Sequence, residues 1–197
     1  MRVIGLTGGI GMGKSTAAKV FRRAHIPVFD ADAAVHALQA PGGRALPMIA
    51  AAFPGTVSGG VLDRDALRRA VIGDADAMRR LEAILHPMVR RLERAFLLRA
   101  RRARAPAAVL DIPLLLETGG ERRVDTVIVV SAPRAVQVER VRRRRKLDPA
   151  QVAALIARQM PDREKRRRAD LVVPTGLSHH YAQRMLRRFI RTLRDGR

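Results

Sequence analysis

The chain has 197 residues, of which 47% are hydrophobic and 29% charged, and it carries a formal net charge of +21 without any cysteine. This composition excludes a disordered chain, and no apolar run is long enough for a membrane-spanning helix, so we expect no membrane partner. Without cysteine there are no disulfides and no thiolate chemistry, which predicts a protein of the reducing cytoplasm.

The first apolar segment, residues 2–6, is broken at once by glycines, which is typical of a buried strand and not of a signal peptide. Four further apolar segments are predicted strands: residues 27–29, 107–112, 126–131 and 170–173. Helical patterns separate them, and continuous apolar strands between helices indicate a parallel sheet covered on both faces. The sequence therefore predicts an α/β fold with a doubly wound, parallel five-stranded sheet.

A glycine-rich segment follows the first predicted strand and precedes a helix predicted over about 14–24. Gly8, Gly13, Lys14 and Ser15 match the pattern G-x-x-x-x-G-K-[ST] of a nucleotide phosphate loop, in the strand–loop–helix context that the motif requires. Glycines let successive N–H groups point inward at phosphate oxygens, and the start of the following helix adds positive potential. The flanking elements favour a nucleoside-triphosphate site over the alternative, a turn with a chance Gly-Lys-Ser.

The side chains of this loop have distinct expected roles. Lys14 is expected to bind the β- and γ-phosphates and to act in catalysis, the Ser15 hydroxyl to bind Mg²⁺, and Thr16 to contact the α-phosphate side. Met12 occupies a position that the motif leaves free, so its backbone should matter more than its side chain. The residues expected to bind ATP are Gly8, Gly9, Gly11, Met12, Gly13, Lys14, Ser15 and Thr16.

The loop by itself does not name a reaction, because hydrolases, switches and kinases share it. A guanine-specific switch would carry the motif Asn-Lys-x-Asp, and this chain has no Asn. Phosphoryl transfer to a hydroxyl needs a group near the γ-phosphate that accepts or orients the hydroxyl proton. Asp30 and Asp32 follow the second predicted strand, at the edge of the sheet where the loop also lies. We expect Asp30 to cap the next helix or support the site, and Asp32 to be the base, with capping as the alternative.

Residues 33–104 show no strand pattern and indicate several helices, with turns at Gly42-Gly43 and Pro54-Gly55. The strongest helix is predicted over about 74–104. There an apolar stripe recurs at three- and four-residue steps: Met78, Leu81, Leu85, Val89, Leu92 and Phe96. A helical block of this length between two strands of one sheet predicts an inserted substrate domain.

A further acid, Asp111, ends the third predicted strand after an apolar run. An acid in this place resembles the carboxylate that binds Mg²⁺ directly or through water in phosphate-loop proteins. The segment Ile112–Glu117 then continues along the same edge of the sheet. Glu117 is a secondary candidate, because an acid in such a segment is more often a helix or loop residue than a ligand.

Gln137, Arg140 and Arg144 lie on one face of a predicted helix after the fourth strand, at steps of three and four residues. A kinase must exclude water and neutralise charge on the transferred phosphoryl group, and a mobile helix that carries arginine does both. We expect Arg140 to act in catalysis and Arg144 to bind ATP. Most other arginines of this region, including residues 166–168, are expected to be solvated surface charges.

The net charge of +21 raises a second hypothesis, a nucleic-acid-binding ATPase. Only four of the 39 basic residues are lysine, and the arginines are spread over every predicted helix instead of forming one arm. Aromatic residues, at 3%, are too few for base-stacking platforms. We therefore expect no specific nucleic-acid partner. A kinase for another small hydroxyl acceptor is a further alternative.

Together these segments resemble the dephospho-CoA kinase family, which phosphorylates the 3′-hydroxyl of dephospho-CoA. The motifs that carry the resemblance stand in the family's order and spacing over nearly the whole chain: GLTGGIGMGKST, DAD at 30–32, LHP at 85–87, DIPLLLE at 111–117, Gln137, Arg140, Arg144, Gln159, Lys165 and Ala169-Asp170. LTGGIG-x-GKS with DAD and LHP is far more specific than a phosphate loop alone.

The resemblance implies one phosphate-loop kinase domain over residues 1–197. Its core would be residues 1–32 and 105–197, its CoA-binding helical insertion residues 33–104, and its helical lid about residues 137–168. The implied reaction uses ATP as the donor and Mg²⁺ as the metal, and it gives CoA and ADP in the last step of coenzyme A biosynthesis. The chain would act as a monomer or a weak homo-oligomer.

The resemblance also implies roles for single residues. Asp32 would be the catalytic aspartate and would contact the acceptor, together with His86, Leu114 and Glu117. For His86 the alternative is a packing histidine in the long helix before Pro87.

The chain departs from the family's pattern at two places. The family commonly has serine at the position of Met12, and it usually has an Asn followed closely by Gly where this chain has Thr175-Gly176. The second segment is expected to border the adenine, so details of base recognition there should differ.

Overall fold

The computed structural model describes residues 1–176 and 178–195. Positions 177, 196 and 197 of the predicted core therefore lie outside the described residues. The chain divides into two compact units, a first unit of residues 1–29 with 99–197 and a second unit of residues 30–98.

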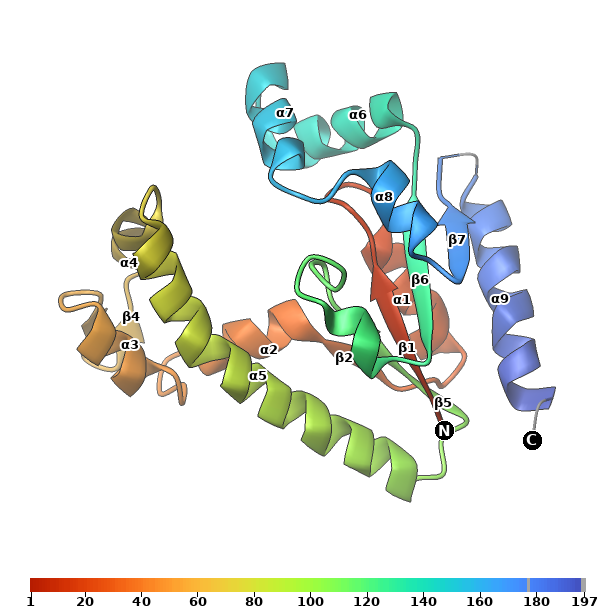
Figure 1. The fold of residues 1–197 in the computed structure, drawn as a ribbon, viewed down its shortest axis with the longest axis horizontal. Helices are drawn as coiled ribbons and strands as arrows, with labels where there is room; N and C mark the ends of the chain where they lie inside the picture. Colours follow the sequence, from red (N-terminus) through yellow and green to blue (C-terminus); the bar gives the residue numbers. More distant parts are fainter. Residues whose placement is uncertain (177, 196–197) are drawn as a thin grey trace. The chain divides into compact units, whose positions relative to one another are not determined.

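The first unit is built on a five-stranded sheet with the strand order β2-β5-β1-β6-β7 (Figure 1). β1 pairs in parallel with β5 and β6, and β6 pairs in parallel with β7. The predicted doubly wound parallel sheet is confirmed. The strands are β1 (Arg2–Thr7), β2 (Val28–Asp30), β5 (Ala107–Asp111), β6 (Thr126–Ser131) and β7 (Leu171–Pro174).

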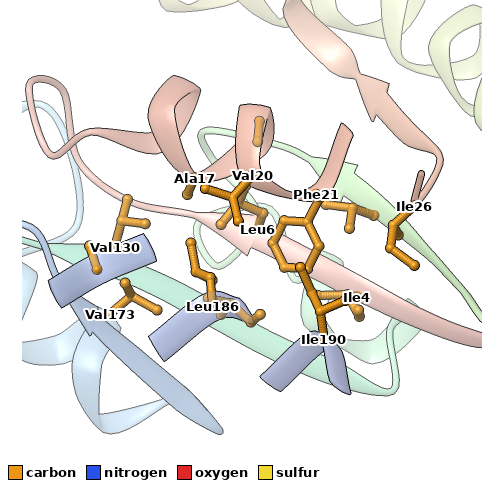
Figure 2. Packing of buried hydrophobic residues seen from close by; sticks show 14 of the residues in the cluster. Ile4, Leu6, Ala17, Val20, Phe21, Ile26, Val130, Val173, Leu186 and Ile190 are labelled. Atoms are coloured by element: carbon orange, nitrogen blue, oxygen red, sulfur yellow. The ribbon is translucent and has the colours of Figure 1, made fainter. Parts of the chain in front are cut away.

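Both faces of this sheet are buried. On one face, α1 and α9 cover the strands, and Figure 2 shows Phe21 of α1 pointing toward Ile4 of β1 and Ile190 of α9. On the other face, Val127 and Val129 of β6 belong to a separate apolar cluster formed with the segment after β5. Burial on both faces explains the continuous apolar runs of the strands. The helices of this unit are α1 (Lys14–Arg23), the 3₁₀ helix η1 (Gly120–Arg123), α6 (Arg134–Arg145), α7 (Pro149–Ala157), α8 (Asp162–Arg167) and α9 (His179–Asp195).

The second unit has a core of its own, to which residues from its helices contribute. Its elements are α2 (Ala31–Leu38), α3 (Leu46–Ala52), β3 (Val57–Ser58), β4 (Val61–Leu62), α4 (Arg64–Val71) and α5 (Ala75–Arg102), of which the last four residues belong to the first unit. The antiparallel hairpin of β3 and β4 contradicts our expectation that residues 33–104 contain no strand. The two strands are too short to show an alternating pattern, and Gly59-Gly60 forms the turn between them with positive φ angles.

The apolar stripe predicted on the long helix is only partly correct. Leu81, Leu85 and Val89 pack into the core of the second unit, but Met78 and Leu92 are 38% and 37% exposed. The buried face of α5 is rotated and includes Ala77, Ile84 and Met88 instead. Spacing identifies a helix with one apolar side, whereas the neighbouring elements decide where the centre of that side lies.

Candidate active site

The glycine-rich segment connects β1 to α1 and has the geometry of an anion site. Gly13 is the N-cap of α1, with a φ of 89°. Among the described residues no side chain caps α1, and its first turn contains no acid. The first N–H groups of a helix have no partner within the helix, and they form the positive end of its dipole. The predicted ATP-binding residues Gly8, Gly9, Gly11, Met12, Gly13, Lys14, Ser15 and Thr16 all lie in this loop or the first turn of α1.

The predicted catalytic lysine and the predicted metal ligand form an ion pair. Lys14 Nζ lies 2.5 Å from Asp111 Oδ1, and the Asp111 side chain is buried. The strand register explains the approach, because Asp111 ends β5 opposite Leu6 of β1, just before the loop begins. Lys14 and Asp111, two of the groups predicted to act in phosphoryl transfer, therefore lie at one edge of the sheet.

The side chain of Met12 is buried beneath the phosphate loop. It is only 2% exposed and belongs to the apolar cluster under α1 and α9. Its Sδ atom accepts a hydrogen bond of 3.0 Å from the backbone N–H of Ala132, which follows β6. The position that the motif leaves free therefore faces the protein interior, so its side chain has a structural role beside that of the backbone.

Helix α6 lies against the phosphate loop. Arg140 donates to the backbone oxygen of Thr175 at 2.7 Å and, at the longer distance of 3.5 Å, to that of Gly11. Gln137 is buried and donates from Nε2 to the backbone oxygen of Ile10 at 2.9 Å. Arg144, which we predicted to bind ATP, is exposed on the last turns of α6. The structure thus brings Gln137 and Arg140 to the loop.

Glu117, a predicted acceptor contact, takes part in a buried ion pair. Its Oε1 atom lies 2.7 Å from Nζ of Lys165 and accepts a hydrogen bond of 3.1 Å from the backbone N–H of Met160. Its Oε2 atom is buried and has no hydrogen-bond partner within the described part of the chain. Leu114, in the turn between Asp111 and Glu117, is exposed. This segment is thereby tied to the connection between α7 and α8.

The acids of the DAD motif have different positions in the fold. Asp30 is the N-cap of α2, and its Oδ1 atom accepts a hydrogen bond of 3.0 Å from the N–H of Ala33, as expected of a capping residue. Asp32 lies in the first turn of the same helix and is exposed, so it is not the cap. His86 is exposed on α5, which does not favour the alternative of a packing histidine.

Comparison with known protein families identifies the family of this chain. The family model of dephospho-CoA kinase matches residues 2–178, which include the phosphate loop, Asp111, α6 and Thr175. The chain belongs to the dephospho-CoA kinase family.

Individual relatives in the family agree with this result. The chain is 51% identical to a dephospho-CoA kinase of Gluconobacter oxydans, over 99% of each chain. It is 56% identical to one of Mesorhizobium japonicum, over 89% of this chain and 88% of the relative. Among solved structures, it resembles TT1252 from Thermus thermophilus with a TM-score of 0.84 and 39% identity, over 98% of this chain and 97% of the other.

Two residues near this site had no role assigned to them in the sequence analysis. Gln159 accepts a hydrogen bond of 2.8 Å from the N–H of Ile10, and Lys165 is the fully buried partner of Glu117. A signal for Lys165 was present in the composition. The chain has 35 arginines among its 39 basic residues, so a position that keeps lysine is a candidate for a specific role. Lys14, the lysine of the loop, is another of the four.

Across residues 1–176 and 178–195, no helix is both long and apolar enough to cross a membrane. Within the same residues, no group of three or more His, Asp or Glu side chains is arranged to hold a metal ion.

Proposed function

We propose that the chain transfers the γ-phosphoryl group of ATP to the 3′-hydroxyl of dephospho-CoA, giving CoA and ADP in the last step of coenzyme A biosynthesis. The observation that carries the proposal is the family match over residues 2–178. The phosphate loop, with Lys14 beside Asp111, supports it with the groups that phosphoryl transfer requires.

In this reaction the acceptor oxygen forms a bond to the γ-phosphorus while the bond from that phosphorus to the β,γ-bridging oxygen breaks. We infer that Asp32 accepts the proton of the acceptor hydroxyl, since its exposed carboxylate is not used as a helix cap. Lys14 and Arg140 supply positive charge toward the phosphates, and the start of α1 supplies N–H groups. Arg144 is proposed as a further ATP contact from α6.

Ser15 and Asp111 are the proposed ligands of Mg²⁺, because a hydroxyl and a carboxylate are oxygen donors of the kind this ion prefers. The first lies at the start of α1, and the second ends β5 beside the loop lysine. When bound, the ion neutralises negative charge on the phosphate oxygens.

The acceptor needs contacts outside the phosphate loop. We propose that the helical insertion predicted over residues 33–104 binds dephospho-CoA, with His86 as one contact. The proposed contacts on the segment after β5 are Leu114, which is exposed, and Glu117, whose buried Oε2 atom has no hydrogen-bond partner within the described residues. Residues 137–168 are proposed as the lid.

The test is an assay of the purified full chain with ATP, Mg²⁺ and a panel of acceptors. ADP release is measured by a coupled assay, and CoA formation by mass spectrometry. We expect turnover with dephospho-CoA and none with shikimate or nucleosides. Turnover with one of those acceptors and none with dephospho-CoA would contradict the proposal. ATP turnover that DNA or RNA stimulates at physiological salt would instead support a nucleic-acid-binding ATPase.

The cellular location and the assembly are further proposals. The composition supports a cytoplasmic protein, and we propose a monomer or a weak homo-oligomer. Light scattering over a range of protein concentrations tests the assembly, because a concentration-independent mass above that of one chain would exclude both.

A further inference from the structure

We propose that Gln137 and Thr175 are positioning residues that turn N–H groups of the phosphate loop toward the triphosphate. This inference rests on the proposed function only in taking ATP as the donor.

Three consecutive backbone oxygens of the loop accept hydrogen bonds from side chains outside it. The oxygen of Ile10 accepts from Nε2 of Gln137 at 2.9 Å, and that of Met12 accepts from the hydroxyl of Thr175 at 2.7 Å. Between them, the oxygen of Gly11 accepts the longer contact of 3.5 Å from Arg140. The donors come from α6 and from the residue after β7, so two distant segments hold one short stretch of loop.

These contacts determine where the neighbouring N–H groups point. In a trans peptide, the oxygen of one residue and the N–H of the next point in opposite directions. Holding the oxygens of Ile10 and Met12 against the protein therefore directs the N–H groups of Gly11 and Gly13 away from those donors. A row of N–H groups on one side of a curled backbone is the arrangement that binds phosphate oxygens.

The two peptide groups that flank Ile10 are each held by a side chain. Its N–H donates to Oε1 of Gln159 at 2.8 Å, while its oxygen accepts from Gln137. The chemistry of the partners assigns both side-chain amides, because a backbone N–H needs an oxygen acceptor and a backbone oxygen needs a donor. With both contacts in place, this residue of the loop cannot rotate without losing one of them.

Close packing of α6 on the loop is an independent observation. A Cβ atom at Gly11 would lie 2.7 Å from Cγ2 of Val141 and 3.0 Å from the backbone oxygen of Gln137, and the φ of Gly11 is +77°. A Cβ atom at Gly9 would lie 3.2 Å from Nε2 of Gln137. The loop therefore needs glycine at position 11 for contact with α6 as well as for its positive φ, while Gly9 lies close to the Gln137 amide.

Thr175 is itself held in place. Its backbone N–H donates to the oxygen of Ser131 at 2.7 Å, and its backbone oxygen accepts from Arg140 at 2.7 Å. The hydroxyl has a single proton, and its shorter contact is to Met12 rather than to Ser131 at 3.2 Å. We expected this segment to border the adenine. Its contacts assign Thr175 a role toward the phosphates.

The test uses substitutions that keep shape and remove the side-chain donor to the loop, together with a longer contact in which that side chain accepts, from Arg140 at 3.3 Å for Thr175 and from Arg134 at 3.4 Å for Gln137. Thr175→Val removes the hydroxyl, Thr175→Ser keeps it, and Gln137→Met replaces the amide with an apolar chain of similar length. We expect Thr175→Val and Gln137→Met each to raise the KM and the Kd for ATP about tenfold, the effect of one lost hydrogen bond at the upper end of its usual range. Thr175→Ser should stay close to wild type, and the KM for dephospho-CoA should not change.

Thr192→Val is the matched control, because the Thr192 hydroxyl donates to a backbone oxygen within α9 at 2.7 Å, without contact to the loop. The inference is overturned if Thr175→Val binds ATP like wild type, if Thr175→Ser is as impaired as Thr175→Val, or if KM rises equally for both substrates. ATP affinity measured by calorimetry separates this test from the acceptor assay. A chain that binds ATP but does not phosphorylate dephospho-CoA would contradict the proposed function. The ATP affinities of the Thr175 variants would still test the present inference.

Discussion

Lys14 and Asp111 are 97 positions apart in the sequence, yet Nζ of the lysine lies 2.5 Å from Oδ1 of the aspartate. The contact exists because β1 and β5 are parallel neighbours, so the loop that follows one strand meets the last residue of the other. The cation expected to bind phosphate and the acid expected to bind Mg²⁺ thus neutralise each other's charge in this structure.

Replacement of the loop lysine tests whether this edge of the sheet is the donor site. Lys14→Ala should reduce kcat by about 100-fold or more, since it removes a charge that stabilises the transferred phosphoryl group. The measurement is coupled ADP release at saturating dephospho-CoA. Lys19→Ala, an exposed lysine on the same helix, is the control and should retain wild-type rates. Near-normal turnover of Lys14→Ala would show that the donor binds elsewhere.

The role proposed for Asp32 makes a different prediction. Asp32→Asn should lower kcat by a factor of about 10²–10⁴ while the Kd for ATP changes little, because the carboxylate is needed when the hydroxyl loses its proton. Steady-state kinetics and an ATP titration measure the two effects separately.

Asp65→Asn is a closely matched control for Asp32→Asn. Asp65 is an exposed acid in the first turn of α4, the position that Asp32 has in α2. The control should leave kcat unchanged, because Asp65 shares with Asp32 its position in a helix but has no proposed contact with the acceptor. A loss of ATP affinity without a loss of kcat in Asp32→Asn would make Asp32 a metal or structural residue instead.

The ion pair of Glu117 and Lys165 should contribute to stability. The side chains are 19% and 0% exposed, so Lys165→Met leaves a largely buried carboxylate without its partner. Removing one member of a buried pair typically lowers the free energy of unfolding by about 3 kcal/mol or more. For a chain of this size, that corresponds to a decrease in Tm of about 6–12 °C.

Thermal unfolding with a surface pair as the reference checks this prediction. Arg168 and Glu164 are also an ion pair, but their side chains are 45% and 34% exposed. Arg168→Met should therefore change stability by less than about 1 kcal/mol. Equal Tm values for the Lys165 and Arg168 variants would mean that the buried pair does not stabilise the fold.

Elements with a strong local pattern could be predicted from the sequence. All five strands of the sheet were identified to within one residue at each end, because their apolar runs are buried on both faces. The hairpin at residues 57–62 was missed, since two-residue strands carry no periodicity, although Gly59-Gly60 is itself a turn signal. The buried contacts of the Met12 side chain could not be predicted, because the motif describes the backbone of the loop and not what packs beneath it.

What the sequence alone determined is the chemistry that short-range patterns carry: the phosphate loop, the acids at strand ends, the parallel sheet and the resemblance to a kinase family. Only the tertiary structure decided which of these groups meet. Gln137 reaches Ile10 across 127 positions, and Thr175 reaches Met12 across 163. Such contacts depend on strand order and on the packing of α6 against the loop, and no local spacing encodes them.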